Sequence, residues 1–247
     1  MNVIRYILML SLLFIITSCG VSEDCFKGKG NRVSQTFPIE NFTKIKVYDG
    51  VGLVIKEGAN YEVRIETSDN IIDVLDVRLN GDMLIVKDNS TCNVARDYGQ
   101  TVVYVTSPNL EEIHSKTDQD IKSDGILNYP LLRLFSMDLS DGAGTGDFYI
   151  NLESTGQFVI ESNNVSNFYL NGYTNQLLLS FYFGNGRFYG ENLEAEEIIL
   201  FQRGSNDMIV KPLQSISGTI YATGNVILKN VPPIIEVEEV FTGRLIY

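Results

Sequence analysis

The pattern of apolar and polar positions in the C-terminal half of the chain repeats. The stretches 146-GDFYINL-152, 166-SNFYLNG-172 and 186-GRFYGEN-192 each place turn-forming and polar residues before an apolar strand start. The first apolar residue of the motif recurs at intervals of 20, 20, 20, 18 and 19 residues, at Phe148, Phe168, Phe188, Met208, Val226 and Leu245. A repeat of this length without helical periodicity predicts a β-solenoid in which each repeat forms one coil.

Side chains along each strand of such a coil face alternately inward and outward. Gly190 interrupts the second inward column and predicts a local gap or bend. A second strand of each coil is expected about ten residues before the motif, with its register left open; the candidates are 157–161, 176–181, 196–201 and 216–221. The inward set is predicted to be Phe148, Phe168, Phe188, Ile150, Leu170, Val210 and Leu228.

The N-terminal half also contains strand-like alternation, but without the regular period. Asn80-Gly81 lies between two apolar runs and predicts a hairpin turn. An open end of a coil stack would promote edge-to-edge association, so an irregular cap is expected here, and coil-like spacing resumes over 108–125. Strands are expected at 44–48, 52–57, 61–67, 74–79, 83–88 and 101–107.

These patterns together predict one all-β domain over residues 36–247. The expected fold class is a right-handed parallel β-helix, or solenoid, with coils of about 18–20 residues and an irregular N-terminal β cap.

The composition narrows the functions to consider. The chain has 247 residues and a formal net charge of −12. An acidic surface repels phosphate backbones, so nucleic-acid binding is not expected, and it disfavours direct docking onto anionic lipid head groups. The single histidine, His114, leaves little material for histidine-based catalysis or a histidine-rich metal site.

The first 18 residues predict a signal peptide. Arg5 precedes the apolar run 6–16, which is too short to span a bilayer. The stretch 15-IITSCG-20 resembles the lipobox of bacterial lipoproteins, and this resemblance implies cleavage before Cys19 and lipidation of that residue. The alternative is an ordinary secretory signal with an incidental cysteine.

Residues 19–35 are expected to form a lipid-anchored tether. Ser22, Glu23 and Asp24 resemble the short acidic surface-export signals of Bacteroidetes lipoproteins, although a solvated acidic linker is the alternative. The expected location is the outer membrane, lipid-anchored and with the outer face preferred.

Two further cysteines, Cys25 and Cys92, would meet oxidising conditions in an exported chain. A disulfide between them would pin the tether to the domain and stabilise it by about 2–5 kcal/mol. Two unrelated thiols are the alternative.

Clusters of carboxylates raise the possibility of catalysis or cation binding. No basic partner recurs beside the carboxylates at matched positions of the repeat, so a solvated acidic surface is preferred over a glycan-cleaving site. The run 117-TDQDIKSDG-125 lacks the spacing of known calcium loops, and a hydrated turn is preferred there. No cofactor or metal ion is expected. The carboxylates in question are Asp138, Asp141 and Asp147; Glu194, Glu196 and Glu197; and Asp118, Asp120 and Asp124.

The outward positions of the repeat form the main candidate binding surface. Tyr149, Tyr169 and Tyr189 are expected to stack into a flat aromatic strip that could bind sugar rings or a partner protein. The alternative, given more weight, is an aromatic ladder that only stabilises the sheet. The column continues as Ile209, Ile227 and Ile246.

Three parts of the chain carry a resemblance to a known family. They are the ordered positions Phe42, Ile45, Val47, Gly50, Leu53, Ile55 and Gly58, the stretch 81-GDMLIVKDN-89 and the terminal stretch 216–247. On these motifs the chain resembles the family of putative autotransporter-adhesin head GIN domains, over about residues 36–247. The resemblance implies a β-helix-like fold, exported in Bacteroidetes, and carries over no catalytic residue. The turns of this chain depart from the family's usual Ser-Gly-Ser-Gly pattern at 163–164, 184–186 and 205–207.

The expected function is therefore a non-catalytic lipoprotein of the cell envelope. It would serve as a surface adhesion or ligand-binding module, anchored to the membrane by its lipid and contacting a glycan or an envelope or host surface protein. The alternatives are a structural or regulatory envelope protein without a small ligand and, third, a carbohydrate-active enzyme on a β-helix.

Overall fold

The computed structural model describes residues 30–90 and 101–247. The predicted signal peptide and the three cysteines Cys19, Cys25 and Cys92 lie outside the described residues, so the signal peptide, the lipidation and the disulfide stay predictions. The described part is all-β, as predicted, apart from one turn of 3-10 helix, η2 (Ile72–Val74). It contains no helix with the length and apolar character needed to cross a membrane.

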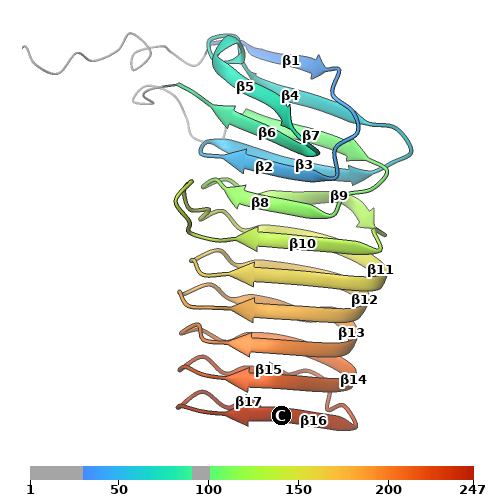
Figure 1. The fold of residues 1–247 in the computed structure, drawn as a ribbon, viewed down its shortest axis with the longest axis vertical. Coiled ribbons are helices and arrows are strands. Elements are labelled where there is room, and N and C mark those ends of the chain that lie inside the picture. The colour runs from blue at the N-terminus through green and yellow to red at the C-terminus, as the bar shows by residue number, and fades with distance from the viewer. Residues whose placement is uncertain (1–29, 91–100) are drawn as a thin grey trace, which may run out of the picture.

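The strands form two layers that run the whole length of the molecule (Figure 1). Layer A has the order β5–β6–β2–β8–β10, continues through the second halves of β11, β12, β13 and β14, and ends at β16. Layer B has the order β1–β4–β7–β3–β9, continues through the first halves of β11 to β14, and ends at β15 and β17. One apolar core cluster includes buried residues from both layers.

The molecule divides into two regions, which we call the cap and the coil stack. The cap comprises β1 (Arg32–Phe37), β2 (Lys44–Tyr48), β3 (Val51–Glu57), β4 (Glu62–Ser68), β5 (Leu75–Asn80), β6 (Met83–Asp88) and β7 (Thr101–Ser107). The coil stack comprises β8 (Glu112–Lys116), β9 (Ile121–Leu127), β10 (Leu131–Ser136), β11 (Phe148–Ser162), β12 (Phe168–Phe181), β13 (Phe188–Gln202), β14 (Met208–Ile220), β15 (Val226–Leu228), β16 (Ile234–Glu239) and β17 (Leu245–Ile246).

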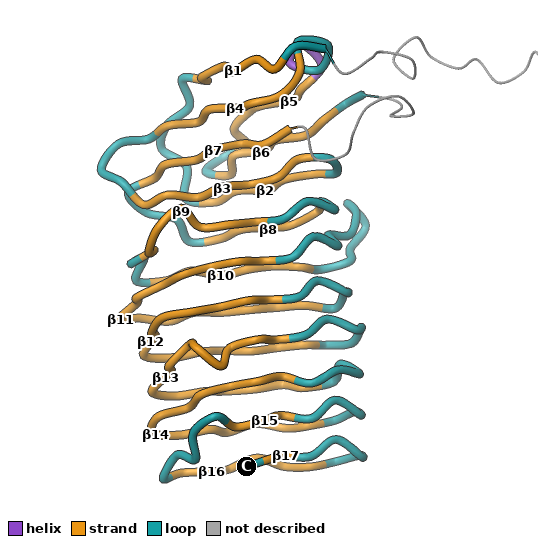
Figure 2. Tube along the Cα trace, turned by 180° about the vertical axis from the view of Figure 1, so that it is seen from behind, coloured by secondary structure: helices purple, strands orange, loops and turns teal. Residues whose placement is uncertain are grey.

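Strands of the coil stack pair in parallel with the equivalent residues of the next coil. Phe148 pairs with Phe168, Phe168 with Phe188 and Phe188 with Met208, so the repeat aligned on the sequence is also the register of the sheet. The turns of successive coils lie one above another along one edge (Figure 2). The predicted inward set is confirmed, because all seven residues are at most 6% exposed.

One irregularity of the stack traces to a particular residue, Gly190. At Gly190 the pairing of β12 and β13 shifts register between Tyr169 and Asn171, which is the predicted local bend. A side chain at Gly190 would meet the ring of Phe188 at 2.4 Å, so that ring leans over the glycine. The second strands, whose register the sequence left open, align on Gln157, Gln176, Glu197, Ser215 and Ile234.

The cap pairs its outer strands antiparallel and its inner strands parallel. β1–β4, β4–β7 and β5–β6 are antiparallel, whereas β7–β3 and β6–β2 are parallel and continue the direction of the coils. All six strands predicted for this half are present, and Gly81 has the positive φ of +64° expected in the turn between β5 and β6.

Among the strands that were not predicted are β1 and β10. β1 begins at Arg32, inside the stretch expected to be a tether, and pairs along its whole length with β4. It is an outer strand with only Val33 and Phe37 partly buried, so its sequence carries little alternation. β10 escaped detection because its coil is longer, with Leu134 pairing with Ile160 across a loop that breaks the regular period.

Candidate functional site

A single column of outward-facing residues runs the length of layer B, and we call it the outer column. Each member pairs with the next through the sheet register, so every strand of the layer contributes one residue. The predicted tyrosine strip, Tyr149, Tyr169 and Tyr189, lies in the middle of this column. In order, the outer column is Thr36, Arg64, Tyr104, Val54, Lys122, Tyr149, Tyr169, Tyr189, Ile209, Ile227 and Ile246.

The three rings of the tyrosine strip stack on one another. Ring centroids are 4.8 Å apart between Tyr149 and Tyr169 and 4.7 Å apart between Tyr169 and Tyr189, and both pairs lie 4° from parallel. Tyr149 is 39% exposed and the other two are half-buried. Because each ring covers a face of its neighbour, the strip presents ring edges and hydroxyl groups rather than the flat aromatic surface expected from the sequence.

The hydroxyl groups of the strip are not used in contacts within the described part of the protein. Within the described residues, none of the three makes a hydrogen bond to the protein. Partial burial raises the pKa of Tyr149 and of Tyr169 above the ordinary value, and the nearby carboxylate of Asp147 adds to the effect on both. At neutral pH these two hydroxyls are therefore available to donate to an external acceptor or to accept from an external donor.

Polar ladders flank the strip on both sides. On one side, the side-chain amide of Asn171 donates to Oδ1 of Asn151 at 3.0 Å. On the other side, Asp147 accepts from the backbone N–H of Asn167 at 2.8 Å, and Oδ1 of Asn167 accepts from the backbone N–H of Arg187 at 3.2 Å. These bonds cross from coil to coil, so the polar residue before each motif phenylalanine stabilises the stack while lining the strip.

A hollow of about 320 Å³ lies on the same face, where the cap meets the coil stack. Lys122 and Tyr104, two members of the outer column, line it. The ammonium of Lys122 lies 5.3 Å from the ring centre of Tyr149, and the guanidinium of the neighbouring Arg64 lies 4.1 Å from the ring centre of Tyr104. The carboxylate of Asp120 pairs with Lys122 at 3.0 Å. The lining residues are Gly52, Leu53, Val54, Val102, Tyr104, Asp118, Gln119, Asp120 and Lys122.

The hollow was not predicted from the sequence. Its walls come from β3, β7 and β9 and from the turn before β9, which are brought together by parallel pairing across long sequence separations. A signal was present in Gly52, a glycine inside an apolar strand pattern, which indicates either a bulge or an open space above the backbone.

The other carboxylate clusters are divided among separate partners. Glu194 pairs with Lys211 at 2.8 Å, Glu196 accepts from the hydroxyl of Tyr173 at 3.1 Å, and Glu197 accepts from Gln176 at 3.1 Å. In the other cluster, Asp118 caps the backbone N–H of Gly50 at 3.0 Å and Asp124 lies 3.6 Å from Lys56. No group of three or more potential metal ligands converges among residues 30–90 and 101–247.

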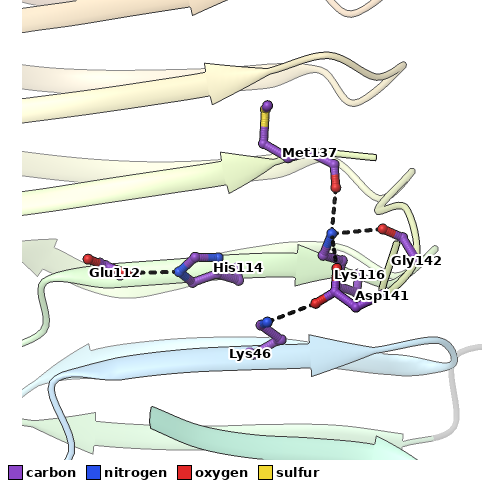
Figure 3. A network of polar contacts seen from close by, with 7 residues as sticks. All are labelled: Lys46, Glu112, His114, Lys116, Met137, Asp141 and Gly142. Carbon is purple, nitrogen blue, oxygen red and sulfur yellow. Dashed lines mark hydrogen bonds and ion pairs between the residues drawn. The ribbon is translucent and has the colours of Figure 1, made fainter. Parts of the chain in front are cut away.

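Asp141 belongs to a network that joins the cap to the stack (Figure 3). Its carboxylate accepts from Lys46 of β2 and from Lys116 of β8, both at 2.8 Å. Lys116 is only 3% exposed and also donates to the carbonyls of Met137 at 2.6 Å and Gly142 at 2.7 Å. The hydrogen bonds from the two lysines lower the pKa of Asp141 to about 2, so this carboxylate is a fixed anion that holds the loop against both regions.

His114, the only histidine, lies beside this network and is a packing residue. Its ring stacks on Phe135 with centroids 4.5 Å apart, and its Nε2 lies 2.9 Å from the carboxylate of Glu112. Burial lowers the pKa of His114, with Glu112 acting in the opposite direction. A neutral imidazole can donate from Nε2 to Glu112 while its ring packs on Phe135.

Comparison with known proteins identifies a family. The sequence model described as "Putative auto-transporter adhesin, head GIN domain" matches residues 41–232, which cover the cap from β2 onward and most of the coil stack. No functionally curated protein matches the chain.

Solved structures share the fold at low sequence identity. A putative adhesin from Bacteroides fragilis is 19% identical, with a TM-score of 0.78 over 87% of this chain and 96% of that one. A putative adhesin from Parabacteroides merdae is 15% identical, with a TM-score of 0.57 over 89% of this chain and 98% of that one. A putative lipid binding protein from Parabacteroides distasonis is 14% identical, with a TM-score of 0.58 over the same shares of the two chains.

Proposed function

The chain belongs to the putative auto-transporter adhesin, head GIN domain family, and from that premise we propose that it is a non-catalytic adhesion module of the cell envelope that binds glycans through its tyrosine strip. The observation that carries the proposal is the exposure of the strip. Its hydroxyls have no hydrogen-bond partner among the described residues. A ladder that only stabilises the sheet has no need of such open hydroxyls.

A saccharide chain matches the chemistry of this surface. Sugars offer alternating C–H and hydroxyl groups, which suit ring edges beside phenol hydroxyls. The flanking amide and carboxylate ladders add further hydrogen-bonding groups on both sides, while the aliphatic residues Ile209 and Ile227 lengthen the apolar part of the surface. Tyrosine-rich surfaces also bind well because their side chains lose little conformational entropy on binding.

A non-catalytic role is supported by how the acidic residues are used. Asp141 has two lysine partners and Glu194 has one, so neither is available as an acid or base. A glycan-cleaving enzyme needs a pair of carboxylates that face one another across a substrate.

The shape of the module follows from the same register. We propose that the coil stack is a right-handed parallel β-solenoid capped by the irregular N-terminal strands, because strand–crossover–strand connections in parallel sheets are almost always right-handed. Lipidation of Cys19 would anchor this module to the outer membrane, with the strip directed outward, and a disulfide between Cys25 and Cys92 would fix the tether to the cap.

A glycan array probed with the full-length protein tests the function. Wild-type protein is compared with a Tyr169→Ala, Tyr189→Ala double variant. The matched control is Leu178→Ala, Ile199→Ala, which changes outward residues of the same two strands on layer A. Circular dichroism verifies that both variants are folded.

Binding by wild type and by the control, but not by the tyrosine variant, would support the proposal. Equal binding by all three would remove the strip from the proposal. An absence of binding to every glycan would favour a structural role for the module.

A further inference from the structure

The geometry points to the hollow between cap and coil stack as a second element of the surface: a subsite for the terminal ring of an uncharged saccharide, whose following rings lie along the tyrosine strip. This inference rests on the proposed function. It assigns a binding place to the terminal ring of the saccharide, which the strip alone does not recognise. A volume of about 320 Å³ is in the lower part of the range of small-molecule pockets.

The hollow combines an apolar floor with an aromatic wall. Val54 and Val102 face outward from neighbouring strands, and Gly52 leaves the floor open beside them. Tyr104 stands between Arg64 on β4 and Val54 on β3, with the Arg64 guanidinium 4.1 Å from its ring centre. Arg64 therefore covers Tyr104 toward the cap, and the hollow begins beyond the ring, where the C–H face of a sugar can pack.

The rim of the hollow supplies the polar groups that recognise hydroxyls. Asp118, Gln119 and Asp120 come from one turn, and Lys122 rises beside them. Asp118 accepts from the backbone N–H of Gly50 and from the side-chain amide of Gln119, and Asp120 pairs with Lys122. These contacts fix the orientation of both carboxylates and leave lone pairs for sugar hydroxyls. Two carboxylates against one ammonium disfavour an anionic sugar and select an uncharged one.

The hollow is continuous with the strip. Lys122 is the member of the outer column next to Tyr149, and its ammonium lies over the ring of Tyr149. Because no tyrosine stacks on that side, the face of Tyr149 toward the cap is covered only by a flexible side chain. A saccharide that places its end in the hollow can thus run past Lys122 onto the strip without leaving layer B.

The backbone at Gly52 does not require a glycine. Its φ is outside the positive range that favours glycine, and a Cβ built on it would make ordinary contacts of 3.7 Å with Asp120 O, Thr101 O and Gln119 Cβ. The backbone therefore accepts a Cβ at this position, and the further methyl groups of a valine would occupy the hollow. The experiment uses this property.

The full-length protein is titrated with methyl glycosides of glucose, galactose and N-acetylglucosamine, with glucuronic acid as the anionic comparison, and binding is read by saturation-transfer difference NMR and calorimetry. Gly52→Val should reduce the affinity for the best methyl glycoside about tenfold or more, since it occupies the floor. Asp120→Asn should reduce it about tenfold by weakening a charge-assisted hydrogen bond while keeping the shape. Ser217→Val, which places the same valine side chain at an outward strand position of layer A, should leave it unchanged.

The outcomes separate the subsite from the function of the strip. Loss of methyl-glycoside binding in Gly52→Val and Asp120→Asn, with binding retained in Tyr169→Ala, would support the subsite. Array binding that depends on the tyrosines but is unchanged in both hollow variants would overturn the subsite and leave the proposed function standing. Preference for glucuronic acid would overturn the selection of an uncharged ring, and an absence of binding to arrays and glycosides alike would overturn both proposals.

Discussion

The cap and the coil stack contain the same two layers and share one core, yet they are built on different rules. In the stack, each residue pairs with its own equivalent one coil later, so rings lie on rings and amides on amides. In the cap, antiparallel outer strands pair residues of unlike type, such as Arg64 opposite Tyr104. The stack is thus stabilised by repetition of a few contacts, and the cap by contacts that each occur once.

The difference also shows in how each region ends its sheet. The outer strand β1 is short and mostly exposed. Its Arg32 forms an ion pair of 2.8 Å with Glu66 on the neighbouring strand β4. Charged side chains on a short outer strand discourage pairing with another chain. The inner coils need no such protection against pairing with another chain, because each coil is covered by the next.

The largest effect should come from the repeated core. Phe168→Ala removes a fully buried ring that stacks on Phe148 at 4.6 Å and also contacts Phe181. We expect a loss of about 3–5 kcal/mol in the free energy of unfolding, measured by urea denaturation followed by circular dichroism. Tyr169→Ala, one residue away but outward, should cost about 1 kcal/mol. Similar losses for the two variants would contradict the inward and outward assignment.

Glycine should be required more strictly in the stack than in the cap. Gly172 has a φ of +114°, and a Cβ there would lie 1.9 Å from the carbonyl oxygen of Leu152 in the preceding coil. Gly172→Ala should therefore cost about 3 kcal/mol, from strain together with a backbone clash. Gly81 also has a positive φ, but no atom lies within 4 Å of its Cβ position, so Gly81→Ala should cost only about 1 kcal/mol. Thermal denaturation of the pair would sharpen the contrast, and equal shifts would remove it.

The junction between the two regions should depend on pH. Asp141→Asn weakens the bond to buried Lys116 and should cost about 1–2 kcal/mol at pH 7, an effect limited by the partial exposure of the carboxylate. The pKa of Asp141 is lowered from 3.8 to about 2 in the folded protein, so its stabilisation is complete above about pH 4 and disappears as the pH falls through 2. Urea midpoints of wild type and variant should therefore converge between pH 4 and pH 2. A difference that persists below pH 2 would show that the carboxylate is not its source.

The smallest effect should come from a single link of the polar ladder. Asn167→Ala leaves the backbone N–H of Arg187 without its side-chain acceptor and should cost about 1 kcal/mol. Asn192→Ala is the matched control, because the side chain of Asn192 makes no hydrogen bond within the described residues. Equal stability of the two variants in urea would mean that the ladder only lines the strip and does not stabilise the coils.

The two regions differ also in how far the sequence predicts them. The repeat predicts the pairing of Phe148, Phe168 and Phe188, because equivalent positions carry the same residue after a similar turn signal. The strands of the cap are visible as alternation, but their order is not, since which of β3, β7 and β9 lie side by side depends on pairings far apart in sequence. For this reason the tyrosine strip was predicted residue by residue, whereas the hollow beside it and the Lys116–Asp141 network were not.

The sequence predicted that the tyrosines stack, but not the orientation of their rings. The repeat indicates which rings are neighbours, but not that each is parallel to the next within 4°. Ring orientation follows from the side-chain torsions allowed by strands about 4.8 Å apart, a distance at which rings in the same conformation lie on one another.

The one-to-one register of the outer column ties the length of the molecule to its number of repeats. Each added repeat of the kind that begins at Phe168 would lengthen the molecule by about 4.8 Å and add one outward side chain at the same angle, without altering the core positions on either side. The length of the outer column is therefore set by how many times one segment is copied, and internal duplication of that segment would extend the column while the cap keeps its form.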